Sequence, residues 1–204
     1  MEFSVAGYAA WRAGEGASPD VSFIPPLERR RLTGVERAAL SVAWQVRPEG
    51  EAPVVFASRW GEIGVTVKLM TQFHADREMS PAGFSASVHN AAPGAFSLLT
   101  HNHAPYTAIA ARERSMEAGI LEALVQGTAV VFVFAEEATP TFYAPEFGPL
   151  QEACALAVRL EPGGPFRAEF RAADCPPVAF DAADAFFSGR TDSLASASFI
   201  LSRG

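Results

Sequence analysis

SPAGFSASVHNAAPG, residues 80–94, is the most informative stretch of this sequence. It joins a short apolar segment, Phe84 to Val88, to the small residues that open an expected helix, Ala91 to Leu99. The crowding of Gly, Ala, Ser and Asn indicates close backbone packing. In many α/β enzymes a strand-to-helix turn of this kind presents the nucleophile, because the orphan N–H groups and the dipole at the helix start favour negative charge. His89 and Asn90 occupy the tip, which carries no cysteine.

Apolar segments on both sides of this stretch alternate between strand-like and helix-like periodicity. The predicted strands are Glu2 to Trp11, Pro53 to Ser58, Tyr106 to Ala111 and Ala129 to Ala135, then an edge or hairpin strand at Cys154 to Leu160 and a strand at Arg167 to Phe170. The predicted helices start at Pro25-Pro26 or cover Val35 to Val46, Val65 to Phe73, Ala91 to Leu99, Met116 to Gln126 with Ser115 as its N-cap, and Ala179 to Phe187. Because strand and helix alternate up to residue 135, we expect an α/β fold with a mostly parallel mixed sheet and helices on both faces. We expect residues 1–204 to form one domain, in which 146–204 has the weakest pattern.

Composition and charge limit the classes of function. Of the 204 residues, 49% are hydrophobic and 19% are charged, as in a globular protein with a sizeable core. A net charge of −7 argues against non-specific binding to nucleic acid. The N-terminus does not resemble a secretory signal, and the longest apolar run, Ala129 to Ala135, is far shorter than a membrane span. Cys154 and Cys175 form no CxxC motif, so we expect two thiols in the reducing cytoplasm.

Several ordered segments together resemble one protein family. They are Phe56-Ala-Ser-Arg59 with Gly61-Glu62, Ser80-Pro81 with the Phe84-Ser-x-Ser87-Val-His-Asn-Ala91 segment, Gly94, Thr107 to Ala111, and Gly119 to Ala123. Over about residues 30–145 this set is similar to the β-ketoacyl synthase N-terminal-like family, within the thiolase-like superfamily. Its short members are described as chain-length factors of aryl-polyene-type biosynthesis.

The resemblance implies a half-thiolase fold, with His89 and Asn90 where an active synthase keeps its cysteine nucleophile. That cysteine works because a helix N-terminus raises its thiolate fraction. Asn90 cannot form a thioester, and the two histidines of an active synthase come from a second half that this sequence does not include. The resemblance therefore implies a catalytically silent partner of a full-length ketosynthase, without a cofactor, that closes the acyl tunnel of a heterodimer.

The same resemblance suggests where partners bind. Ser87 and the small residues Ala91, Ala92 and Gly94 are candidate partner or tunnel contacts, although ordinary helix–sheet packing also explains small residues. Arg29, Arg30 and Arg31 are candidates for docking an acyl carrier protein, because arginine pairs well with phosphate and carboxylate groups. A solvated helix turn is the alternative for these arginines.

Two alternatives come from other classes of protein. Gly83-Phe-Ser85-Ala-Ser87 resembles a nucleophile elbow, which would make Ser85 the nucleophile of a serine hydrolase with a nearby histidine as its base. The other alternative is a homodimeric scaffold protein. His101-Asn102-His103 has two imidazoles but no thiol or acidic ligand at helical spacing, so we expect a loop and no metal site.

Overall fold

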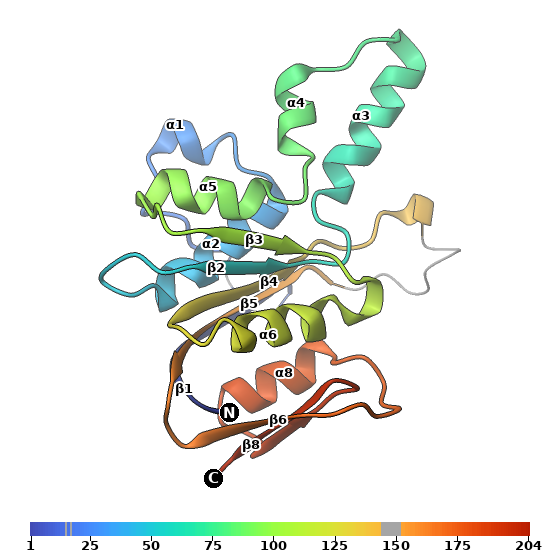
Figure 1. Cartoon of the computed structure of the whole chain (residues 1–204). Coiled ribbons are helices and arrows are strands. Elements are labelled where there is room, and N and C mark those ends of the chain that lie inside the picture. Colours follow the sequence, from blue (N-terminus) through green and yellow to red (C-terminus); the bar gives the residue numbers. More distant parts are fainter. Residues whose placement is uncertain (15, 17, 144–151) are drawn as a thin grey trace.

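One mixed sheet forms the centre of the protein (Figure 1). The computed structural model describes residues 1–14, 16, 18–143 and 152–204. Within them, eight strands are arranged in the order β3-β2-β4-β5-β1-β6-β8-β7. The strands are β1 (Glu2–Arg12), β2 (Val54–Ala57), β3 (Tyr106–Ile109), β4 (Val130–Glu136), β5 (Cys154–Pro162), β6 (Phe166–Phe170), β7 (Ser193–Ala195) and β8 (Phe199–Arg203).

The α/β class is confirmed, but the expectation of a mostly parallel sheet is wrong. Strand β2 pairs in parallel with β3 and β4, whereas the other five pairings are antiparallel. Residues 163–165 join β5 to β6, and residues 196–198 join β7 to β8. Both connections are shorter than the dozen or so residues that a parallel crossover needs, so the chain reverses direction there.

Helices cover both faces of the sheet, as expected (Figure 1). Helices α2 and α5 pack on one face, where Val42, Phe56 and Phe96 are buried. The helices are α1 (Pro26–Arg29), α2 (Gly34–Val46), α3 (Ile63–Asp76), α4 (Pro81–Ala86), α5 (Ala91–Thr100), α6 (Ser115–Val125) and α8 (Phe180–Phe187), with 3₁₀ turns η1 (Arg112–Arg114) and η2 (Thr141–Tyr143).

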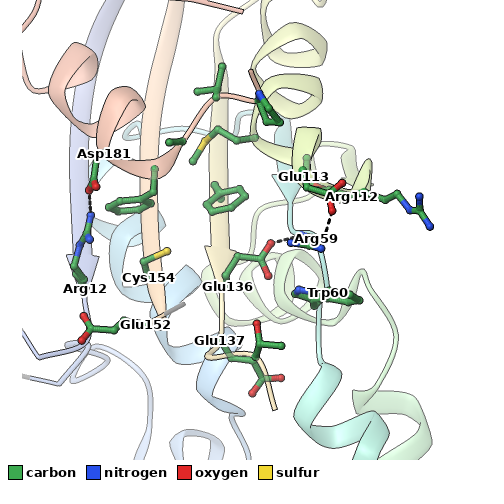
Figure 2. A pocket seen from close by; sticks show the side chains of 18 residues that line it. Arg12, Arg59, Trp60, Arg112, Glu113, Glu136, Glu137, Glu152, Cys154 and Asp181 are labelled. Atoms are coloured by element: carbon green, nitrogen blue, oxygen red, sulfur yellow. Dashed lines mark hydrogen bonds and ion pairs between the residues drawn. The ribbon is translucent and has the colours of Figure 1, made fainter. Parts of the chain in front are cut away.

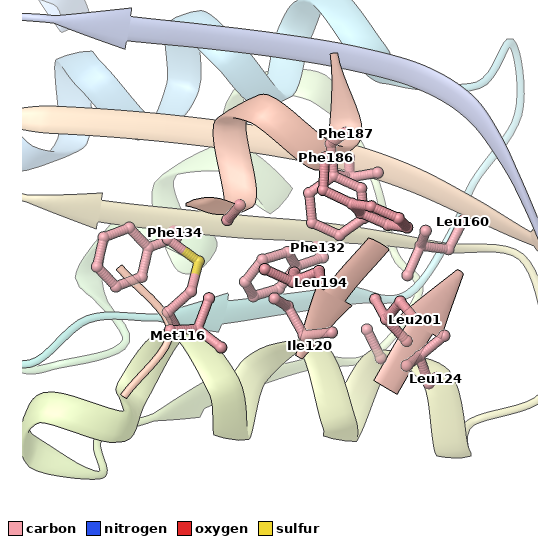
Figure 3. Packing of buried hydrophobic residues seen from close by; sticks show 14 of the residues in the cluster. Met116, Ile120, Leu124, Phe132, Phe134, Leu160, Phe186, Phe187, Leu194 and Leu201 are labelled. Carbon is pink, nitrogen blue, oxygen red and sulfur yellow. The ribbon is translucent and has the colours of Figure 1, made fainter. Parts of the chain in front are cut away.

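The opposite face of the sheet carries the larger aromatic core (Figure 3). Ile120 of α6, Phe132 of β4 and Phe186 of α8 are fully buried there. Helix α6 approaches the sheet closely at Gly119, where an added Cβ would lie 2.5 Å from the Phe132 ring and 2.6 Å from the Ala57 Cβ. The predicted helices at residues 116–126 and 179–187 are thus confirmed by packing on this core.

Two local predictions about strands are wrong. Phe84 belongs to helix α4 rather than to a strand. Ser80 caps this helix by accepting a hydrogen bond from the Gly83 N–H at 3.2 Å, and Pro81 suits its first position because the missing N–H is not needed there. Strand β5 is central rather than an edge or hairpin strand, because it lies between β4 and β1. Its burial on both faces resembles that of β4.

Helices α3 and α4 form an arm that stands away from the sheet (Figure 1). Of the residues of α3, only Leu69 is buried, whereas Met70 and Phe73 are exposed. Phe84 of α4 is 59% exposed. The arm therefore leaves apolar surface uncovered. No helix in the described part of the chain is both long and apolar enough to cross a membrane.

Candidate functional site

The predicted nucleophile position lies between two helices. His89 and Asn90 connect α4 to α5, so no strand leads into this tip. The Nε2 atom of His89 donates a hydrogen bond to the Ile109 carbonyl oxygen at 3.1 Å. Its Nδ1 atom faces Gly61, where an added Cβ would lie 2.6 Å away. The imidazole therefore wedges between the turn after β2 and the end of β3.

Ser85 does not lie on a nucleophile elbow, and that prediction is wrong. It is inside α4, and its hydroxyl donates to the Pro81 carbonyl oxygen one turn earlier at 3.0 Å. An elbow requires a sharp turn between a strand and a helix. The serine hydrolase alternative thus loses its geometric basis.

The other predicted site residues differ in their surroundings. Ala92 is buried in the core beneath α5, so packing within this chain explains its small size. Gly94 is partly exposed. The same holds for Ala91 and Ser87, whose hydroxyl donates to the Phe84 carbonyl oxygen. The roles of Gly94, Ala91 and Ser87 in partner or tunnel contacts stay predictions.

The three adjacent arginines are not equivalent. Arg29 donates to the carbonyl oxygens of Ile24 and Ser22, so it holds the loop before α1. Arg30 and Arg31 are exposed, and Arg31 pairs loosely with Glu28 at 3.8 Å. Docking of a carrier protein therefore stays a prediction that is best placed on Arg30 and Arg31.

A pocket of about 560 Å³ opens at the carboxyl ends of strands β2 and β4 (Figure 2). Three neighbouring strands supply its base, because Arg12 of β1 is opposite Cys154 of β5, and Cys154 is opposite Glu136 of β4. Residues opposite one another on paired strands point to the same face. The three side chains therefore lie side by side, on the face that α6 and α8 cover. Ligands of α/β sheets commonly bind at this end of the strands.

Two ion pairs border the pocket. Arg12 pairs with Asp181 of α8, and its guanidinium lies 4.8 Å from the Phe180 ring centroid. Arg59, which follows β2, pairs with Glu113 of η1 at 2.7 Å. The ion pairs link β1 to α8 and the end of β2 to η1. Four segments of the chain therefore border the pocket and are connected in pairs.

Buried carboxyl groups dominate the electrostatics at this end of the strands. Glu136 is 5% exposed, and burial raises its pKa to about 7 although its Oε1 accepts from the Arg59 N–H. Burial likewise raises the pKa of Glu62 to about 8, although the Thr33 hydroxyl donates to it at 2.9 Å. The pKa of Glu137, which accepts from the Gly64 N–H, is raised for the same reason. These groups hold protons at a higher pH than ordinary carboxyl groups do.

The thiol in this pocket is a poor nucleophile. Burial and the nearby Glu136 carboxyl raise the pKa of Cys154 to about 12. Cys154 opens a strand rather than a helix, so no helix dipole favours its thiolate. Among the residues that the structure describes, no group of three or more His, Cys, Asp or Glu side chains is arranged to hold a metal ion.

Sequence reasoning missed this pocket, although a signal was present. Arg59-Trp60 lies just beyond the buried apolar strand β2, and Glu136-Glu137 stands at the end of the buried apolar strand β4. Polar residues at that position mark the carboxyl ends of parallel strands, which meet at one edge. The contributions of Arg12 and Cys154 depend on pairing between strands far apart in the sequence, which a local pattern does not indicate.

The fold and the position of the pocket define the class of protein. It is an α/β protein with a mixed sheet that helices cover on both faces, and its pocket lies at the strand ends. Residues 6–190 match the family model for the β-ketoacyl synthase N-terminal domain, and the chain belongs to that family. The resemblance suggested by the sequence is thereby confirmed. No curated protein sequence matches the chain.

Solved structures with this fold include both short and long chains. One is the complex of the ketosynthase ApeO with its chain length factor ApeC from Xenorhabdus doucetiae. The match to one chain of that complex has a TM-score of 0.82 and 20% identity, and it covers 100% of this chain and 100% of the matched chain. A β-ketoacyl synthase from Burkholderia phymatum STM815 has a TM-score of 0.59 and 14% identity, over 87% of this chain and 58% of that one. These similarities confirm the thiolase-like half-fold.

Proposed function

We propose that this protein is a catalytically silent partner of a full-length ketosynthase, with the role of a chain-length factor in aryl-polyene-type biosynthesis. The observation that carries the proposal is chemical. The tip at His89 and Asn90 offers no thiol, and His89 is held by the Ile109 carbonyl oxygen. The buried Cys154 thiol, with its pKa near 12, does not replace the missing nucleophile.

The arm of α3 and α4 and the edge strand β3 supply the surface for the ketosynthase. Phe84, Met70 and Phe73 on the arm are exposed apolar residues, and Tyr106 of β3 is 40% exposed. Strand β3 has a single neighbour, β2, among the described strands. Uncovered apolar surface beside an open sheet edge is typical of an interface. The full-length match to one chain of the ApeO–ApeC complex supports a ketosynthase as the partner.

In this proposal Ser87, Ala91 and Gly94 lie at or near the interface and help to close the acyl tunnel of the ketosynthase. Each CH₂ group that the tunnel accommodates contributes about 0.8 kcal/mol, so a closed end discriminates between chain lengths. Arg30 and Arg31 contact the acyl carrier protein within the complex. The proposal places all of these proteins in the cytoplasm.

Co-expression with a full-length ketosynthase from the same organism tests the partnership. We expect the two chains to co-purify as a heterodimer, and we expect Phe84→Asp to abolish co-purification. Phe170→Asp is the matched control, because Phe170 is 47% exposed on β6, away from the arm. A stable homodimer that ignores the ketosynthase would instead support the scaffold alternative.

Mass spectrometry tests the absence of catalysis. The complex is incubated with an acylated carrier protein, and each chain is then weighed. We expect the acyl group on the ketosynthase alone, and the Cys154→Ala variant of this protein should give the same result. An acyl adduct on Cys154 would contradict the proposal.

A further inference from the structure

The arm of α3 and α4 is attached to the sheet and its covering helices, here called the body, with little apolar packing (Figure 1). Leu69 is the single buried residue of α3, and it packs on α4, because an added Cβ at Gly83 would lie 2.9 Å from its Cδ2 atom. None of the residues of α4, all of which the structure describes, is buried. The attachment of the arm therefore depends on side-chain hydrogen bonds at its two ends.

Three hydrogen bonds fasten these ends. Glu62, the last residue before α3, accepts from the Thr33 hydroxyl at 2.9 Å. Glu137, which follows β4, accepts from the Gly64 N–H in the first turn of α3. His89 fastens the turn after α4 to the end of β3. Two of these three hydrogen bonds thus depend on carboxyl groups.

Glu62 is buried at the base of the arm beside two other carboxyl groups. It is 3% exposed, and burial raises its pKa to about 8. The charges of Glu36 on α2 and of Glu137 raise this pKa as well. Arg37 of α2 donates to a backbone carbonyl oxygen, and Arg59 after β2 pairs with an acidic side chain. An ionised Glu62 in this position is therefore poorly solvated and is repelled by both neighbouring carboxylates.

Three other titratable groups lie around this base. An ionised Glu137 accepts more strongly from its backbone donor in α3, and its charge penalises a second charge at Glu62. Glu136 accepts from the backbone N–H of Arg59, and the His89 ring donates to the end of β3. The charges that act most strongly on Glu62 are thus negative.

We propose that the arm is a proton-sensitive element, docked on the body while Glu62 is neutral and held less firmly once Glu62 is ionised. In the released arm Glu62 reaches water and loses its proton at its ordinary pKa of 4.5. Between this value and about pH 8, the docked state holds a proton that the released state has lost. Docking therefore weakens as the pH rises through this range and levels off above it. This inference concerns the chain by itself and does not depend on the ketosynthase partnership.

Hydrogen exchange of the full chain, followed by NMR between pH 6 and pH 8, tests the proposal. Protection factors remove the intrinsic effect of pH on the exchange rate. The Gly64 amide reports on the arm, because it donates to Glu137 in the docked state, and the Val42 amide of α2 reports on the body. We expect Gly64 to be less protected than Val42 and to lose protection by about tenfold or more over this range. Protection equal to that of Val42 at every pH, or protection that does not fall with pH, would overturn the proposal.

A variant pair identifies the group responsible. Glu62→Gln stays neutral at every pH and keeps an acceptor for the Thr33 hydroxyl, so the protection of Gly64 should change by less than about threefold between pH 6 and pH 8. Glu78→Gln removes an exposed carboxyl group between α3 and α4 and should keep the original pH dependence. An unaltered pH dependence in Glu62→Gln would contradict the assignment.

Carboxyl-carbon NMR of the unsubstituted protein tests the same assignment, which matters if Glu62→Gln does not fold. With ¹³C-labelled glutamate and assignment through bonds, we expect the Glu62 carboxyl group to titrate near pH 8, where Gly64 has lost its protection. Titration of Glu62 below about pH 6, close to the value of an ordinary carboxyl group, would overturn the proposal.

Discussion

Single residues at the strand ends are placed at a cost in free energy. Glu62 and Glu136 are buried carboxyl groups whose hydrogen bonds do not fully compensate for the loss of water. His89 is placed by close packing, because its ring fills the volume beside Gly61. Gly61 has a φ of +55°, so both its backbone conformation and the contact with His89 require glycine.

The raised pKa of Glu62 makes stability depend on pH. Between its ordinary value of 4.5 and about 8, the folded protein holds a proton that the unfolded chain has released. The free energy of unfolding should therefore be largest at low pH and fall as the pH rises through about 8, as far as this group contributes.

Glu62→Gln mimics the protonated carboxyl group and keeps an acceptor for the Thr33 hydroxyl. We expect it to stabilise the protein by about 1–2 kcal/mol at pH 8, with little effect at pH 5. Urea unfolding at both pH values measures this difference. Glu169→Gln serves as the control, and the same pH dependence in both variants would contradict the role of Glu62.

Single elements are positioned by how closely they approach the sheet. Helix α6 lies against β2 and β4 with Gly119 at the point of contact, whereas α3 contacts the body of the protein mainly near its first turn. Glu137 accepts from the Gly64 N–H in that first turn, where the helix dipole favours a negative charge. The two helices differ greatly in burial: seven residues of α6 are buried, but only Leu69 of α3.

Gly119→Ala should therefore destabilise the protein by about 1–3 kcal/mol, because the new methyl group overlaps Phe132 and Ala57. Chemical denaturation measures the change. Gly34→Ala is the matched control near the start of α2, where an added Cβ meets nothing within 4 Å. Its effect should stay within about 0.5 kcal/mol. Equal destabilisation by the two substitutions would show that close packing at Gly119 is not the cause.

The whole molecule divides into a well-packed body and a loosely attached arm. The body has aromatic and aliphatic cores on both faces of the sheet, and the arm of α3 and α4 contributes only Leu69 to the buried hydrophobic residues. Elements with few buried contacts open locally at low cost in free energy. In the proposed complex, the ketosynthase covers the arm and buries its exposed apolar residues.

Hydrogen exchange should show this division directly. Amides of 63–86 are expected to exchange faster than those of α2 and β4 in the isolated protein, and to become protected once the ketosynthase is bound. Protection that appears only at β6 to β8 would place the partner on another surface. Mass spectrometry of peptic fragments measures both states.

Much of the fold was predictable from local pattern. The helix at residues 35–46 and the strand at 129–135 were recognisable because their apolar periodicity matches the burial that the structure shows. The α4 helix was missed because its apolar residues resemble a short strand. The signal that distinguishes it from a strand is Ser80 as the N-cap followed by Pro81 in the first turn, a pair that favours a helix.

The sequence alone was enough to establish the α/β class, the family and the lack of a cysteine at the tip, because these depend on residue identity and on short-range periodicity. The pocket was decided by tertiary structure. Arg12, Glu136 and Cys154 meet only because β1, β4 and β5 are neighbours, which depends on long-range strand pairing. The same holds for the raised pKa values, because burial arises from packing between distant segments.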